Sequence, residues 1–122
     1  MGGVLSKDEI LGAQDIKRVE VDCPEWGGSV MIQSMNGTQR DAFDAWCVAN
    51  KPNNMGMRAM LVMLCAVDQN GRPLFSETDL PMLQEKNGDV LTRLFMAAHD
   101  INSLGRPRIE ELKQDLPKGQ SA

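Results

Sequence analysis

Residues 19 to 43 constrain the fold of this chain more than any other segment. Two runs in which apolar and polar residues alternate, 19–23 and 29–33, flank the turn sequence Pro-Glu-Trp-Gly-Gly at 24–28. Strict alternation is typical of a strand with one buried face, and a short proline- and glycine-rich break between two such runs is typical of a hairpin turn. The segment therefore predicts an antiparallel β-hairpin that leads directly into a helix.

The turn itself is predicted to be structural. Pro24 cannot donate a hydrogen bond to a strand ladder, so it belongs at the end of the first strand. Gly27 and Gly28 supply the positive-φ positions that a tight turn needs. We expect Trp26 to fold back over the apolar face of the hairpin, packed rather than exposed for binding a partner.

The remaining signals predict helices. Ser6 and Glu9 form a capping box at the start of a short helix over about 7–14, with Ile10 and Leu11 as its apolar contacts. Thr38 is the predicted N-cap of the helix that follows the hairpin. Further helices are expected over about 55–67, after Ser76, and over about 89–103 with Val90, Leu91, Leu94, Phe95, Ala98 and Ile101 inward.

These elements define an α+β fold that is mainly α-helical: an N-terminal antiparallel β-hairpin followed by a small bundle of about four helices. We expect residues 1–104 to form a single globular domain. Residues 105–122 are polar and contain two prolines, which favours a mobile C-terminal tail.

Methionine-rich helices are the candidate interaction sites. The predicted helix over 55–67 is apolar on every side, so it is either the central core helix or a surface completed by another subunit or partner. Methionine side chains are flexible and adapt to variable partners. One hypothesis is therefore that Met57, Met60 and Met63 take part in self-association or partner binding; the alternative is that they fill the core. In the tail, Ile109, Leu112 and Leu116 share one helical face that would order against a partner.

Composition and charge exclude several classes of function. The formal net charge of −4 lacks the basic face that a general nucleic-acid binder needs. No apolar run reaches the roughly 18–20 residues that span a bilayer, and the N-terminus lacks the features of a secretory signal. Gly2 and Ser6 match the myristoylation pattern, but Ser6 already serves as a helix cap and no basic cluster supplies a second anchor. We expect no membrane or nucleic-acid partner.

Candidate catalytic groups are sparse. The chain has one histidine, His99, and three widely spaced cysteines, Cys23, Cys47 and Cys65, in apolar surroundings. Apolar surroundings keep a thiol protonated and inert, so a Cys–His enzyme is disfavoured. The cysteines read as reduced thiols of a cytosolic protein. No phosphate-binding loop, dinucleotide fingerprint or metal-ligand spacing is present, and the sequence predicts a protein that is not an enzyme and has no cofactor or metal.

Several of these blocks together resemble a known family. The hairpin with its Pro-Glu-Trp-Gly-Gly turn, the helix start Gly-Thr-Gln-Arg-Asp-Ala-Phe at 37–43, the opening Leu-Ser-Lys-Asp-Glu-Ile at 5–10 and the stretch from Leu64 to Leu80 are similar to the tail assembly chaperones of long-tailed (siphovirus-type) bacteriophages. The similarity covers most of residues 5 to 104, but it is a general pattern without a diagnostic site.

The resemblance implies a non-enzymatic assembly factor that binds the phage tape measure protein and promotes assembly of tail tube protein around it. Such a factor would act in the cytoplasm of the infected host, would be absent from the mature virion, and is expected to form a homo-oligomer. The alternative is a head–tail or tail-tube connector that is retained in the virion. A virion component and a transient chaperone differ in whether purified particles contain the protein.

Overall fold

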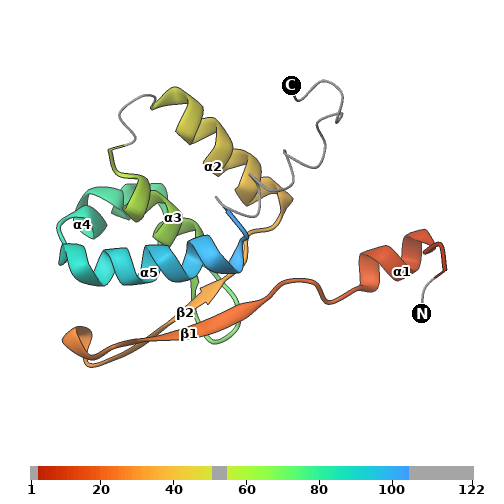
Figure 1. Cartoon of the computed structure of the whole chain (residues 1–122), viewed down its shortest axis with the longest axis horizontal. Coiled ribbons are helices and arrows are strands. Elements are labelled where there is room, and N and C mark those ends of the chain that lie inside the picture. The colour runs from red at the N-terminus through yellow and green to blue at the C-terminus, as the bar shows by residue number, and fades with distance from the viewer. Residues whose placement is uncertain (1–2, 51–54, 105–122) are drawn as a thin grey trace, which may run out of the picture.

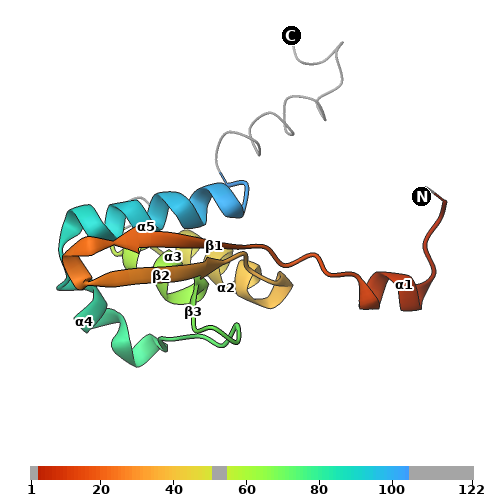
Figure 2. The ribbon, with the colours of Figure 1, turned by 90° about the horizontal axis from the view of Figure 1, so that it is seen from below.

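The computed structural model describes residues 3–50 and 55–104. In chain order the elements are α1 (Lys7–Gly12), β1 (Arg18–Cys23), the 3-10 turn η1 (Pro24–Trp26), β2 (Gly28–Gln33), α2 (Gly37–Ala49), α3 (Met57–Cys65), β3 (Ala66–Val67), η2 (Glu77–Asp79), α4 (Leu80–Gln84) and α5 (Gly88–Ile101). The sheet lies along one side of the body and the helices α2 to α5 lie on the other, while α1 stands apart (Figures 1 and 2). The α+β class, with an N-terminal hairpin followed by helices, is confirmed.

The hairpin is confirmed with the predicted faces. β1 and β2 pair antiparallel, and their register places Val19 opposite Ile32 and Val21 opposite Val30. These apolar pairs lie on the face of the sheet that meets the helices, where Cys23 and Ile32 are fully buried. The hairpin therefore contributes one wall of the core.

The sheet has a third strand that the sequence did not predict. Residues 66 and 67 leave the helix and pair with β2 as β3, so the helix expected over 55–67 ends at Cys65. The pairing covers part of the β2 edge, whose backbone groups would otherwise lack partners. Asp68 then fixes the following turn, because its carboxylate accepts from the amides of Asn70 and Arg72 at 2.8 and 3.0 Å.

Two local predictions need correction. Gly27 has a φ of 81° and caps η1, but Gly28 is the first residue of β2 and is not in the positive-φ region. The N-cap of α2 is Asn36 rather than Thr38. Its side chain accepts from the Gln39 amide while the Gln39 side chain accepts from the Asn36 amide, at 2.9 and 3.0 Å. A reciprocal capping box satisfies two backbone donors, which explains why the helix begins at that point.

The core is centred on α3 and α5. Six of the nine residues of α3 are buried, which confirms its interpretation as a core helix: Ala59, Met60, Leu61, Val62, Met63 and Cys65. On α5 the buried stripe is Val90, Leu91, Leu94 and Ala98, as the periodicity predicts. α5 ends in a Schellman motif, in which the amides of Leu104 and Ser103 donate to the carbonyls of His99 and Asp100.

The N-terminal helix does not contact this core. α1 has the predicted capping box at Ser6 and Glu9 but ends at Gly12, two residues before the predicted end. Ile10 and Leu11 are 56% and 76% exposed, so the apolar contacts expected for them are not made within the described ranges 3–50 and 55–104. We call residues 3–16 the N-terminal arm; it extends well beyond the body in both views (Figures 1 and 2).

Candidate functional site

A groove at the start of α3 is the first candidate site. It holds about 590 Å³ between the N-terminal end of α3, the end of α4 and the first half of α5. Its apolar lining includes Met55, Met57, Leu91 and Phe95, and it also exposes Arg58, Gln84 and Lys86. Adaptable methionine side chains beside positive charge suit a protein segment that is apolar on one side and acidic on the other. We call it the methionine groove.

A second groove lies between the hairpin tip and α4. It holds about 540 Å³ and is lined by Trp26, Leu74, Phe75, Asp79, Met82, Leu83 and Lys86. Trp26, Leu74 and Met82 are 37%, 48% and 64% exposed. Large apolar side chains gathered at an open surface mark an interaction site more often than isolated ones do. We call it the tryptophan groove.

Lys86 joins the two grooves, since it lines both. Its Nζ lies 5.7 Å from the centroid of the Trp26 ring, which is cation–π distance. Trp26 is thus held at the surface by a cation rather than buried over the hairpin face. Pro24 begins η1 and Gly27 caps it, as predicted for hairpin-turn residues, whereas Gly28 already belongs to β2. Trp26, the last residue of η1, also lines a groove.

The three methionines predicted from the sequence separate in the structure. Met60 and Met63 are 6% and 5% exposed within the core, whereas Met57 is half-buried and lines the methionine groove. The burial supports the core interpretation for the first two, and a binding role for the set stays a prediction. Ile109, Leu112 and Leu116 lie outside the described residues.

Sequence reasoning missed the methionines that are most exposed among the described residues. Met55, Met82 and Met96 are 73%, 64% and 51% exposed. Met96 is an apolar residue on the otherwise polar side of α5, so its exposure could have been predicted from the helical period. Met55 precedes its helix and Met82 lies in a helix of five residues, so no helical period distinguishes them.

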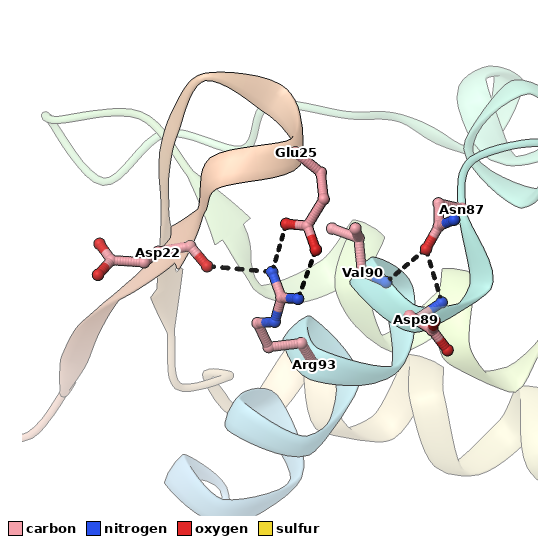
Figure 3. A network of polar contacts seen from close by, with 6 residues as sticks. All are labelled: Asp22, Glu25, Asn87, Asp89, Val90 and Arg93. Atoms are coloured by element: carbon pink, nitrogen blue, oxygen red, sulfur yellow. Dashed lines mark hydrogen bonds and ion pairs between the residues drawn. The ribbon is translucent and has the colours of Figure 1, made fainter.

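A polar brace fixes the hairpin tip against α5 (Figure 3). The Arg93 guanidinium donates to both carboxylate oxygens of Glu25 at 2.7 Å and to the carbonyl of Asp22 at 3.3 Å. Asn87 caps α5 nearby, where its side chain accepts from the amides of Asp89 and Val90. The brace connects a turn and a helix that are 68 residues apart in sequence. Trp26 directly follows Glu25 in that turn and lines a groove together with residues of α4.

The brace predicts a specific acid response. Hydrogen bonds from Arg93 lower the pKa of Glu25 from 4.5 to about 2. A carboxylate whose pKa is lower in the folded state stabilises the fold above its unfolded pKa, and the contribution is lost as the pH falls from about 4.5 towards 2. We expect the melting temperature of the wild type to fall more steeply through this window than that of Glu25→Gln, with a small difference because the pair is exposed. If the melting temperatures of the two proteins fall equally with pH across this window, the brace is contradicted.

Metal-binding side chains, thiols and the imidazole are the groups on which catalysis would most depend. No group of three or more histidine, cysteine, aspartate or glutamate side chains within 3–50 and 55–104 is arranged to hold a metal ion. Burial raises the pKa of the Cys65 thiol to about 11, which keeps it protonated at neutral pH. The centroid of the His99 ring lies 5.7 Å from the centroid of the Phe95 ring. None of the helices in the described part of the chain is long and apolar enough to cross a membrane.

Comparison with known proteins identifies the fold. No family model matches the chain, and no curated protein matches it. Among solved structures, the chain is similar to the tail assembly chaperone of bacteriophage HK97, with a TM-score of 0.59 and 23% sequence identity. The match covers 80% of this chain and 94% of the HK97 protein. This chain therefore has the fold of the HK97 tail assembly chaperone, and its sequence resembles proteins of the same class.

Proposed function

We propose that this protein is a phage tail assembly chaperone that acts without catalysis. The observation that carries the proposal is the shared fold, which covers nearly the whole of the HK97 chaperone and most of this chain. The sequence resemblance across residues 5 to 104 supports the same class. The client would be the tape measure protein, onto which tail tube protein is then recruited, in the cytoplasm of the infected host.

The tryptophan groove is the surface that we assign to the client. An elongated helical client presents a stripe of apolar side chains, and the client tends to aggregate until this stripe is covered. A groove with exposed Trp26, Leu74 and Met82 can receive such a stripe, with Asp79 and Lys86 at its edge to contact polar neighbours. Because Arg93 and Glu25 brace the hairpin tip, the tryptophan side of the groove is already in place before binding.

Co-expression with the tape measure protein of the same phage tests the assignment. We expect the wild-type chain to keep the client soluble and to co-purify with it. Met82→Glu places a charge in the groove at a 64% exposed position, so it should weaken capture at least about tenfold and leave the fold intact. Val48→Glu is the matched control, since Val48 is 67% exposed on α2, and it should leave capture unchanged.

Two results would overturn the proposal. Equal capture by Met82→Glu and wild type would remove the tryptophan groove as the client site. If the wild-type chain neither binds nor solubilises the client, the chaperone function itself fails. Presence of the protein in purified virions at a fixed copy number would instead favour the connector alternative.

A further inference from the structure

The N-terminal arm exposes apolar side chains that a partner could cover. Its helix α1 has only six residues, and so short a helix is marginal unless it packs against something. The capping box holds its first turn, with the Glu9 carboxylate accepting from the Ser6 amide at 2.8 Å. Yet Leu5 and Leu11 are 59% and 76% exposed. The sequence therefore orders a short helix whose apolar side chains the rest of its own chain, as described, leaves in solvent.

The arm leaves the body at the end opposite the methionine groove of its own chain. The Ser34 amide donates to the Lys17 carbonyl and the Lys17 amide donates to Ser34 Oγ, at 2.8 and 2.9 Å, so the chain is fixed at Lys17. The connection Ala13–Ile16 then spans at most about 14 Å. The elements that line the groove include α4 and the start of α5, and these lie at the opposite end of the body from α1 (Figures 1 and 2). The six residues of β1, roughly 20 Å long, run between the two ends.

The arm and the methionine groove are complementary in charge and in apolar character. The first turn of α1 carries a net negative charge, because Asp8 and Glu9 outnumber Lys7, whereas the charged residues that line the methionine groove are Arg58 and Lys86. Leu11 follows Asp8 by three residues, so the two side chains lie on the same face of the helix about 5–6 Å apart. With Leu11 against the methionines of the groove, Asp8 would reach its basic edge.

We propose that the N-terminal arm of one copy docks into the methionine groove of a second copy of this chain. The tryptophan groove fits the arm less well, because Asp79 in its lining would oppose the acidic turn of α1. The contact joins two different surfaces at opposite ends of the molecule, so it is heterologous and each copy can donate one arm and accept another. This inference goes beyond the proposed chaperone function and does not depend on it.

Sedimentation of the purified full-length chain, with no client present, tests the docking. Leu11→Glu changes the arm and Met55→Glu changes the groove, and both positions are more than 70% exposed in a single copy, at 76% and 73%. We expect each variant to raise the dissociation constant of self-association at least about tenfold. Val48→Glu, 67% exposed on α2, should associate as the wild type does. Circular dichroism should show unchanged helix content for all three.

A mixing experiment separates this contact from association through another surface. The Leu11→Glu copy keeps an intact groove and the Met55→Glu copy keeps an intact arm, so the mixture contains one functional pair. We expect it to form a one-to-one complex, at concentrations at which each variant alone is monomeric. A charge exchange gives a second readout. Lys86→Glu should weaken association, and mixing the Lys86→Glu copy with a copy that carries Asp8→Lys should restore part of the association.

The proposal is overturned if wild-type chain sediments as a monomer at high concentration, which would leave the arm for another partner. It is also overturned if Leu11→Glu or Met55→Glu associates as the wild type does, or if the mixture stays monomeric. Failure of client capture in the co-expression experiment leaves these sedimentation results unaffected, so the two proposals fail separately.

Discussion

Replacing Leu94 with alanine is expected to lower the free energy of unfolding by about 2–5 kcal/mol. Leu94 is 1% exposed on the face of α5 that packs in the core, so its removal leaves a cavity and loses apolar burial. A single domain of this size has a total stability of roughly 5–15 kcal/mol, so a loss of about 5 kcal/mol would remove between a third and all of it. Urea denaturation followed by circular dichroism measures the change.

Met96→Ala is the matched control for Leu94→Ala. It removes a similar volume from the same helix, but Met96 is 51% exposed, and we expect a change within about 0.5 kcal/mol. If Leu94→Ala costs less than about 1 kcal/mol, the packing of α5 against the core is wrong.

Replacing Asn102 with alanine has the second largest expected effect, about 1–3 kcal/mol. Its Oδ1 accepts from the Met35 amide at 2.7 Å, and its Nδ2 donates to the Ala98 carbonyl at 2.8 Å and to Cys65 Sγ at 3.4 Å. One side chain therefore connects the segment after β2, the end of α3 and the end of α5. Alanine leaves a partly buried donor at Met35 without its acceptor.

The size of the Asn102 effect can be isolated with a second asparagine. Asn70 lies exposed in the turn after β3, and Asn70→Ala should change the free energy of unfolding by no more than about 0.5 kcal/mol. Equal effects of the two substitutions in chemical denaturation would show that the Asn102 bonds do not hold the three segments together.

Most of the fold could be predicted from the sequence because its signals are local. Alternation at 19–23 predicts β1, and the apolar period predicts the buried face of α5. β3 could not be predicted, since two residues carry no period and the strand exists only by pairing with β2. The caps were predicted where a serine and a glutamate stand in the usual spacing, and missed at Asn36, where the partner is Gln39.

The grooves could not be predicted for a different reason. Met55, Lys86 and Phe95 come from three segments that meet only in the folded chain. A methionine in sequence gives no sign of whether it fills a core or lines a surface, because the same flexible side chain suits both. The separation of buried Met60 and Met63 from exposed Met55 depends on how α3 packs against α4 and α5.

The pair of bonds between Lys17 and Ser34 has a mechanical consequence. By extending the ladder one residue beyond β1, it leaves Ala13–Ile16 as the sole pivot between the body and α1. The twist of the sheet therefore sets the direction in which the arm leaves, and four residues set how far that direction can swing. Shortening this connection would restrict the orientations of α1 relative to the body. Lengthening it with glycines would widen the range of orientations without altering α1 or the body.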